Sequence, residues 1–219
     1  HSVATANLAE TAAEEIGAKP LIARVGAYYH DIGKVRRPDF FFENLAGGEN
    51  PHDSTKPSLS ALIITSHVRD GVELARQHRL PEEIEAIIRQ HHGTSLVRYF
   101  YNKAAESEPG VYEADFRYQA EKPQTREAAL VMLADASEAA VRAARTPSEE
   151  RVQQMVRDVV NDKVADGQLD DADLTLADIE RIVKTYSRML AGMYHARVEY
   201  PEAPVRRVHA DKHHEPSRA

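Results

Sequence analysis

One stretch of the sequence, IEAIIRQHHG at residues 84–93, repeats isoleucine at helical spacing and ends on two histidines and a glycine. Ile84, Ile87 and Ile88 fall on one face of a helix. Pro81 suits the first position inside that helix, and Gly93 suits a left-handed cap at its end. His91 follows the three isoleucines by seven, four and three residues, so it shares their apolar face. This stretch therefore predicts a helix that turns a histidine toward the core.

Similar helical spacing recurs along most of the chain, and no run of strict alternation indicates a strand. Three further apolar stripes are Leu21-Val25-Tyr28-Tyr29-Ile32, Leu59-Leu62-Ile63-Ser66 and Ala128-Val131-Met132. Helix-start signals occur at Thr125, at Thr146-Pro147-Ser148-Glu149 and, more weakly, at Thr175 with Asp178 before a helix that runs to about Tyr194. We predict an all-α fold with four core helices.

Two segments interrupt this pattern, and we expect both to be loops or irregular insertions. They are Pro38–Pro57 and Leu96–Pro123, and they hold nine of the fourteen Tyr and Phe residues. Such aromatic side chains either fill a small satellite core or belong to a lid that contacts a ligand. Beyond residue 200, prolines and scattered charges predict a disordered tail at 201–219, which leaves 1–200 as the domain.

Composition excludes several classes of function. The formal net charge of −7 disfavours binding of polymeric nucleic acid. The absence of cysteine excludes disulfides, thiolate zinc sites and cysteine nucleophiles. No apolar stretch approaches the roughly 20 residues that span a bilayer, so this polypeptide is expected to be soluble. Because it begins at His1 without an initiator methionine, we expect a piece of a longer protein.

Residues with metal-binding chemistry lie on or beside the apolar faces of the predicted helices. Asp135 follows Met132, Val131 and Ala128 by three, four and seven residues, and a buried carboxylate without a partner costs several kcal/mol. His67 continues a second stripe, and His30-Asp31 interrupts a third. The full set of candidate ligands is His1, His30, Asp31, His67, His91, His92 and Asp135.

Five imidazoles and two carboxylates are too many for one ion but suit two ions that share Asp31. A single core histidine is more often a hydrogen-bonded structural residue. The interpretation as a metal site therefore depends on the occurrence of such residues on several apolar faces at once. Manganese or iron fits this donor set best, although zinc, cobalt and nickel also bind such ligands.

These residues carry a resemblance to the HD superfamily of metal-dependent phosphohydrolases, whose pattern is His, His-Asp, Asp. More narrowly, the chain is similar to the cytoplasmic HD domain of seven-transmembrane HD proteins of the PgpH type, which are cyclic di-AMP phosphodiesterases. The stretches that carry it are 27–34 (AYYHDIGK), 50–53 (NPHD), 60–67 (SALIITSH), 90–94 (QHHGT) and 131–135 (VMLAD).

The resemblance implies an HD-domain helical bundle with two irregular insertions near the active site. It assigns His1, His30, Asp31 and Asp135 to one metal, and Asp31, His67, His91 and His92 to the other. It also implies a two-metal hydrolase that converts cyclic di-AMP to linear pApA by metal-activated hydroxide, anchored to a bacterial membrane through a region outside this chain.

Four further residues are candidates for the substrate. Lys34, three residues after Asp31, is predicted to contact the phosphate and so to act in catalysis with Asp31. Arg69 is a weaker candidate, because a surface ion pair with Glu73 explains it equally well. Phe41 and Tyr101 are hypothesised to stack on the bases because aromatic residues are dense in the two insertions. His52 is expected to stabilise a turn.

Several alternatives stay open. A cyclic di-GMP phosphodiesterase of this superfamily has Gly-Tyr-Pro after the paired histidines, where this chain has Gly93-Thr94-Ser95. A guanosine tetraphosphate hydrolase has Glu-Asp where this chain has Lys34-Val35. Nucleotide monophosphatase activity, a nucleotide sensor without turnover and a helical interaction module are further possibilities, and the oligomeric state is open.

Overall fold

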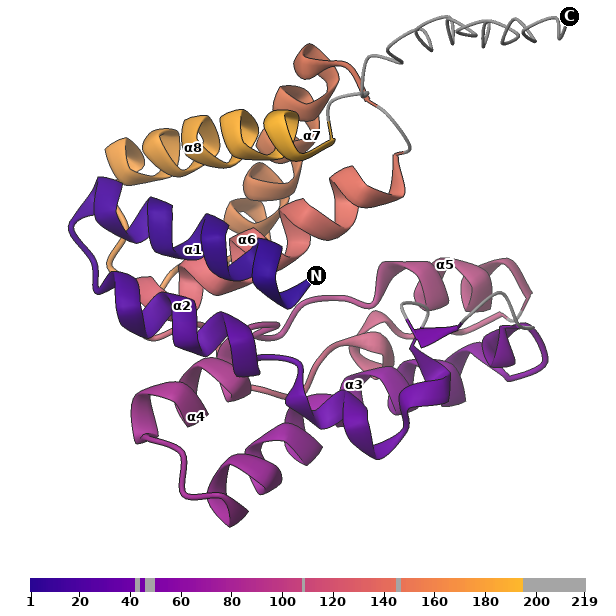
Figure 1. The fold of residues 1–219 in the computed structure, drawn as a ribbon. Helices are drawn as coiled ribbons and strands as arrows, with labels where there is room; N and C mark the ends of the chain where they lie inside the picture. Colours follow the sequence, from indigo (N-terminus) through magenta and orange to yellow (C-terminus); the bar gives the residue numbers. More distant parts are fainter. Residues whose placement is uncertain (42–43, 46–49, 108, 145–146, 195–219) are drawn as a thin grey trace, which may run out of the picture.

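The computed structural model describes residues 1–194 except 42–43, 46–49, 108 and 145–146. Its helices, in chain order, are α1 (Ser2–Ile16), α2 (Pro20–Tyr29), α3 (Pro57–Gln77), α4 (Glu82–Gln90), α5 (Arg98–Ser107), α6 (Arg126–Ala143), α7 (Glu149–Ala165) and α8 (Leu176–Tyr194) (Figure 1). Within the described residues there is no strand, only an isolated bridge between Leu96 and Arg117. The predicted all-α fold is confirmed.

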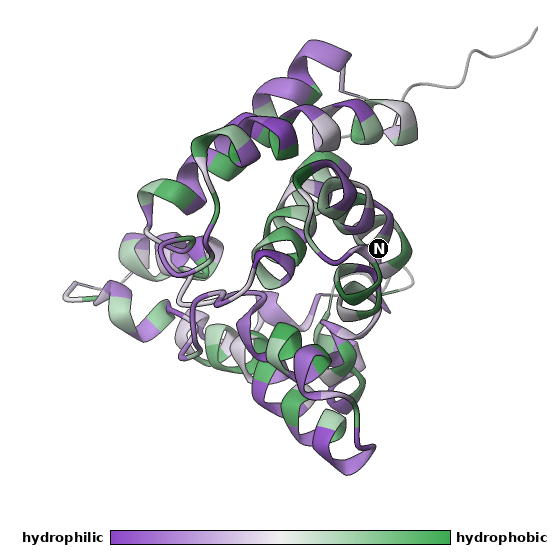
Figure 2. Ribbon diagram, turned by 90° about the vertical axis from the view of Figure 1, so that its left-hand side faces the viewer, coloured by the Kyte–Doolittle hydropathy of each residue, from purple (hydrophilic) through white to green (hydrophobic). Residues whose placement is uncertain are grey.

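The main core lies between α1, α2, α6, α7 and α8, in the upper part of Figure 1. Small side chains dominate where α1 meets its neighbours, because four alanines of this helix are fully buried: Ala6, Ala9, Ala12 and Ala13. Larger residues come from α6 and α8, where Leu130, Leu133 and Tyr186 are fully buried. Most helices carry hydrophobic residues along one side and hydrophilic residues along the other (Figure 2).

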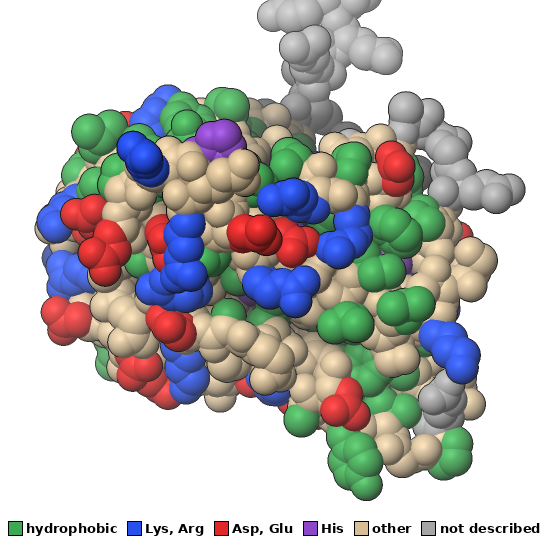
Figure 3. Space-filling view, turned by 90° about the horizontal axis from the view of Figure 1, so that it is seen from below, with side chains coloured by type: hydrophobic (Ala, Val, Ile, Leu, Met, Phe, Trp, Pro, Cys, Tyr) green, Lys and Arg blue, Asp and Glu red, His purple; other side chains and the backbone are tan. Residues whose placement is uncertain are grey.

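Helices α3, α4 and α5 form the lower part of the molecule around two smaller apolar clusters. Ile84 and Ile88 of α4 pack with Ala75 of α3, and Phe100 of α5 packs with Ala61 of α3. Ion pairs also join α3 to α4, since Glu85 accepts from Arg76 at 2.8 Å. Charged side chains of both signs are mixed with hydrophobic ones over the underside of the molecule (Figure 3).

The two parts meet where the 3₁₀ helix Ile32–Arg36 packs on α3. Gly33 makes this approach possible, because a Cβ atom there would lie 1.9 Å from the carbonyl oxygen of His67 and 2.5 Å from the amide nitrogen of Gly71. The backbones of the two elements are thus in direct contact. As a consequence, His30 and Asp31, which directly precede the 3₁₀ helix, lie beside His67.

Two of the four predicted core faces are wrong in part, although Val25 and Ile32 do pack against the cluster of Ala75 and Ile84. On α2, Leu21 is 68% exposed and both Tyr28 and Tyr29 are exposed, while the buried residues are Ala23, Gly26 and Ala27. On α3, Leu59 and Leu62 are exposed, and the helix buries a face of mostly small residues that includes Ser60, Ala61 and Gly71. The faces predicted for α4 and α6 are confirmed.

The expectation of irregular structure at Leu96–Pro123 is also wrong in part, because this segment contains α5 and the 3₁₀ helix Glu113–Phe116. Phe100 and Phe116 are buried in the cluster around Ala61, so the satellite-core interpretation holds for them. The segment Pro38–Pro57 contains the short 3₁₀ helices Pro38–Phe40 and Pro51–Asp53 where it is described.

Three predicted helix starts can be compared with the structure. Thr125 caps α6 by accepting from the amide of Ala128, and Thr175 and Asp178 form a reciprocal capping box before α8. Helix α7 is capped by Ser148 rather than by Thr146, which lies outside the described residues. Pro81 is the N-cap of α4 and Gly93 has the expected positive φ of 54°.

The predicted tail at 201–219 and the domain limit at 200 also lie outside the described residues.

Candidate metal centre

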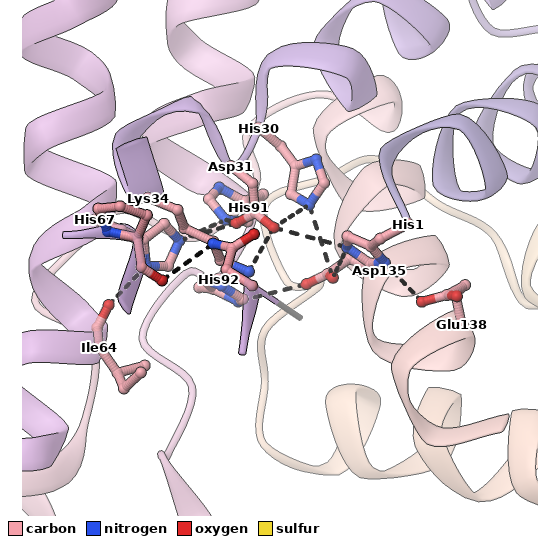
Figure 4. A network of polar contacts seen from close by, with 12 residues as sticks. His1, His30, Asp31, Lys34, Ile64, His67, His91, His92, Asp135 and Glu138 are labelled. Carbon is pink, nitrogen blue, oxygen red and sulfur yellow. Dashed lines mark hydrogen bonds and ion pairs between the residues drawn. The ribbon is translucent and has the colours of Figure 1, made fainter. Parts of the chain in front are cut away.

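The seven predicted ligands converge on one place between the two parts of the molecule (Figure 4). His1 precedes α1, His30 and Asp31 follow α2, and His67 lies on α3. His91 and His92 follow α4, and Asp135 lies on α6. Residues separated by up to 134 positions in the chain thus form a single polar cluster.

Asp31 is the centre of this cluster, and each of its carboxylate oxygens faces a different group of histidines. Its Oδ1 lies 3.3 Å from Nε2 of His67 and 3.8 Å from Nε2 of His91. Its Oδ2 lies 3.2 Å from Nε2 of His30 and 3.7 Å from Nε2 of His1. One carboxylate therefore separates two sets of imidazoles, the arrangement expected of a ligand shared by two ions.

The two sets are completed by His92 and Asp135. Ligand atoms of Asp31, His67, His91 and His92 lie within 4.8 Å of one another, and so do those of His1, His30 and Asp31. Asp135 joins the second set through Oδ1, which is 3.1 Å from Nε2 of His1 and 3.8 Å from Nε2 of His30.

Backbone carbonyls orient three of the imidazoles. Nδ1 of His30 lies 2.7 Å from the oxygen of Ala27, and His67 and His91 make the same contact with the residue three positions earlier, at 2.6 and 2.8 Å. A carbonyl oxygen only accepts, so each Nδ1 carries a hydrogen and each Nε2 faces the cluster. These three rings are therefore held in the orientation that binds metal through Nε2.

In this orientation electron-rich atoms lie close together in a buried site, and a bound cation would remove their repulsion. Nε2 of His67 and Nε2 of His91 are 3.2 Å apart, and neither carries a hydrogen to place between them. Oδ1 of Asp31 is also buried without a hydrogen-bond partner. Lone pairs that face one another in a buried site repel, and a shared cation turns that repulsion into coordination. The residues present fit divalent transition metals.

The two sets differ in their affinity for protons. Burial lowers the pKa of His1, but its hydrogen bonds with Asp135 and Glu138 outweigh burial and raise the pKa to about 9. For His30 burial is likewise outweighed, by the charge of Asp31 and its contact with Asp135, which raises the pKa to about 10. Burial lowers the pKa of His91 to about 3. Without metal, the first two imidazoles hold protons at neutral pH and His91 is neutral.

Two residues of the site were missed by the sequence analysis. Glu138 is buried one helical turn beyond Asp135, and its Oε2 lies 2.6 Å from Nδ1 of His1. Tyr118 is buried with its ring stacked on that of His92, with 4.3 Å between the ring centroids. The spacing of three residues from Asp135 is a signal that could have identified Glu138, whereas nothing local marks Tyr118.

The four candidate substrate residues differ in their distance from the cluster of metal-ligand candidates. The Lys34 Nζ lies 2.6 Å from Oδ2 of Asp31 and 5.1 Å from the centre of the Phe41 ring, and Phe41 is buried beside His67. Tyr101 is half-buried against Phe116. Arg69 is exposed, and in the described part of the chain its ion pair is with Asp70 at 3.5 Å rather than with Glu73. Lys34 and Phe41 therefore adjoin the cluster.

His52 does stabilise its turn. Its amide donates to the side chain of Asn50, and its Nε2 donates to the carbonyl of Phe40 at 2.8 Å. The ring also lies between Phe40 and Phe100, so it joins the first insertion to α5.

Comparison with known proteins gives a consistent family. The model of the HD domain matches residues 1–140. The chain is 49% identical over 203 residues to the cyclic-di-AMP phosphodiesterase PgpH of Bacillus subtilis, covering 93% of this chain and 29% of that protein. It is 45% identical over 202 residues to the protein of the same name from Listeria monocytogenes, covering 92% of this chain and 28% of the relative.

A solved structure agrees in fold. The crystal structure of the L. monocytogenes phosphodiesterase PgpH HD domain in complex with cyclic-di-AMP has a TM-score of 0.86 and 45% identity, covering 89% of this chain and 91% of that one. The chain spans less than a third of the length of the two full-length relatives. Among the described residues, no helix has the length and apolar character needed to cross a bilayer.

Proposed function

Because the chain belongs to the HD-domain family, we propose that it is a metal-dependent phosphodiesterase that hydrolyses cyclic di-AMP to linear pApA. The observation that carries the proposal is the position of Asp31 between two sets of imidazoles, each of which faces one of its carboxylate oxygens. The names of the two relatives and the bound ligand of the similar structure favour cyclic di-AMP over cyclic di-GMP.

Residues His1, His30, Asp31 and Asp135 would hold one cation, and Asp31, His67, His91 and His92 the other, with manganese or iron as the best-fitting elements. When bound, such cations would supply positive charge to the phosphate and would lower the pKa of a coordinated water. The carbonyls of Ala27, Ile64 and Ile88 hold three of the rings in place, so binding needs little rearrangement of the chain.

Lys34 is proposed as the residue of this chain that neutralises charge on the reacting phosphate. Its ammonium group lies beside Asp31 and over the Phe41 ring, at the edge of the cluster. Phosphoryl transfer depends mainly on positioning and on charge stabilisation, so a fixed ammonium group suffices without a side-chain nucleophile. Phe41 confines that ammonium and is proposed to contact the substrate. Arg69 has a weaker claim because it is exposed and paired with Asp70.

The length of the relatives is relevant to a membrane anchor in the longer protein. The two relatives are more than three times the length of the matched region, so this chain corresponds to one part of such a protein. We propose that the whole protein is anchored to a bacterial membrane and holds this domain in the cytoplasm.

The proposal is tested by elemental analysis of the purified chain combined with chromatography of products from cyclic di-AMP and, separately, cyclic di-GMP. We expect about two metals per chain and a linear adenine dinucleotide as the product. Two metals with no cleavage of cyclic di-AMP would contradict the proposed substrate, and fewer than one metal would contradict the site.

The roles of Asp31 and Lys34 are separated by two alanine variants. Asp31→Ala should lose both metals, because each set loses its shared oxygen ligand. Lys34→Ala should keep both metals and lose turnover by about two orders of magnitude, as expected when one charge-stabilising donor is removed. Full metal content in the Asp31 variant would contradict the shared ligand.

A further inference from the structure

A cleft of about 600 Å³ is lined by residues from the segments that carry His92 and Asp135. Two of its lining residues adjoin metal ligands in the chain, because Ser95 comes three residues after His92 and Ala136 follows Asp135. The other walls come from α5, α7 and the 3₁₀ helix Glu113–Phe116. Its volume is in the usual range for small-molecule sites.

Lys163 of α7 brings a charge into this cleft that no carboxylate neutralises at close range. The acidic lining residues are already paired with arginines, since Arg117 binds Asp166 at 2.8 Å and also binds Glu113, and Arg98 lies 3.5 Å from Asp162. Among the described residues no carboxylate oxygen lies within 4.0 Å of the Lys163 ammonium, which instead donates to Oγ of Ser95 at 2.6 Å.

Burial lowers the pKa of Lys163, because its ammonium is partly removed from water without a close counter-ion. A group in that state gains more from binding an anion than a solvated lysine does. An ammonium is also a common phosphate ligand in proteins, where it acts as a point charge.

Several hydrogen bonds hold the segment that carries Ser95, the residue that accepts from Lys163. The amide of Thr94 donates to Gln168, whose side-chain nitrogen returns a hydrogen bond to Oγ1 of Thr94, each at 2.9 Å. Arg117 donates to the carbonyl of Thr94 at 2.8 Å, and the amide of Tyr118 donates to the carbonyl of Ser95 at 3.0 Å. Ser95, whose amide donates to the carbonyl of His92 at 3.0 Å, is therefore fixed relative to this metal-ligand candidate.

We propose that this cleft binds the part of the dinucleotide that is not being cleaved, with Lys163 and Ser95 holding its second phosphate. Lys163 donates to Ser95, and the hydroxyl hydrogen of Ser95 is then available for a phosphate oxygen. Tyr101 lines the same cleft, where a base of the ligand can pack against its ring. The inference rests on the proposed function and adds a second anion site to it.

The test compares Lys163→Met with wild type on two substrates, cyclic di-AMP and bis(p-nitrophenyl) phosphate, which has a scissile diester but no second phosphate. We expect the ratio of kcat/KM for cyclic di-AMP to that for the small diester to fall about tenfold or more, mainly through KM. The dissociation constant of the hydrolysis-resistant bis-phosphorothioate analogue of cyclic di-AMP should rise by a similar factor. Metal content, by elemental analysis, should equal that of wild type.

Lys184→Met is the matched control, because Lys184 is an exposed lysine of α8 outside this cleft, and it should leave the ratio unchanged. Ser95→Ala provides a second test that does not depend on the folding of the Lys163 variant, and it should lower the ratio severalfold.

Unchanged ratios and dissociation constants in both cleft variants would overturn the second anion site while leaving the proposed function intact. An equal loss on both substrates would also overturn it, because the effect would then come from the metal centre. If wild type cleaves the small diester but neither cleaves nor binds cyclic di-AMP, the proposed function fails and the inference fails with it.

Discussion

Helices α4 and α6 bury the faces that their large hydrophobic residues predict, whereas α2 and α3 bury faces made of small residues. In α4 the core is formed by Ile84, Ile87 and Ile88, and in α6 by residues such as Leu130 and Met132. In α2 the buried positions are Ala23, Gly26 and Ala27, while Leu21 faces solvent.

The difference follows from how closely the elements approach. A Cβ on Gly26 would lie 2.3 Å from Cδ1 of Ile87, so α4 packs against the bare backbone of α2. Gly33 and Gly71 bring the 3₁₀ helix after Asp31 equally close to α3. Close approach selects glycine, alanine and serine, and the larger residues of the same helices are then placed outside the interface. Three of the candidate metal ligands, His30, Asp31 and His67, lie beside the contact between the 3₁₀ helix and α3.

The largest effect is expected from Gly33→Ala. The new Cβ would overlap the carbonyl of His67 and the amide of Gly71, and neither backbone group can move without shifting α3. We expect a loss of about 3 kcal/mol in the free energy of unfolding and a loss of metal from the set that contains His67. Chemical denaturation and elemental analysis measure the two quantities.

Gly192→Ala is the matched control, since nothing lies within 4 Å of a Cβ at that position of α8. Its stability should equal or slightly exceed that of wild type. If both variants were equally stable, backbone contact would not be what joins the two parts of the molecule.

A second prediction concerns Glu138, whose carboxylate contacts Nδ1 of His1. The same carboxylate accepts a hydrogen bond from the Tyr194 hydroxyl and pairs with Arg142. Glu138→Gln removes the charge that orients and polarises this ring, so metal affinity of the set containing His1 should fall about 10- to 100-fold. Competition with a metal chelator measures it. Glu180→Gln, which alters an exposed pair with Arg157, is the control and should leave affinity unchanged.

Glu138 also shows where sequence reasoning about the site stops. All seven expected ligands lie in the cluster. They could be predicted from the sequence because each is a polar residue on or beside an apolar stripe. Supporting residues give no such contrast. Tyr118 reaches His92 from an irregular segment, and Lys163 enters from α7, so their positions depend on tertiary packing that the local pattern does not contain. The same limitation explains why α5 and the buried faces of α2 and α3 were missed.

The third prediction uses the contrast in pKa between the two sets of imidazoles. His1 and His30 have pKa values raised to about 9 and about 10, so metal must displace their protons at neutral pH. His91, with its pKa lowered to about 3, has no proton to lose. As pH falls from about 8 to about 6, metal should leave the set containing His1 and His30 first.

Calorimetry in two buffers of different ionisation enthalpy would count these protons, and we expect about two per chain at pH 7.5. In the metal-free protein the effect of pH is opposite, because protonation of His1 stabilises the fold instead of weakening metal binding. The pKa of His1 is raised above the 6.5 of an unperturbed histidine, so protonated His1 stabilises the fold below that pH, and this contribution is lost as pH rises through about 9. Simultaneous loss of both metals with no proton release would contradict the difference between the sets.

The smallest effect tests the reversed face of α3 directly. Leu62 is 65% exposed although it belongs to an apolar stripe, whereas Ala61 beside it is 1% exposed and packs in the cluster with Phe100. Leu62→Gln should therefore change the free energy of unfolding by no more than about 0.5 kcal/mol, while Ala61→Leu should cost about 1–3 kcal/mol through overpacking. Urea denaturation of the two variants distinguishes the faces. If Leu62→Gln were the more damaging change, α3 would bury the face that its large residues predict, and the packing of small residues against the metal centre would have to be reassigned.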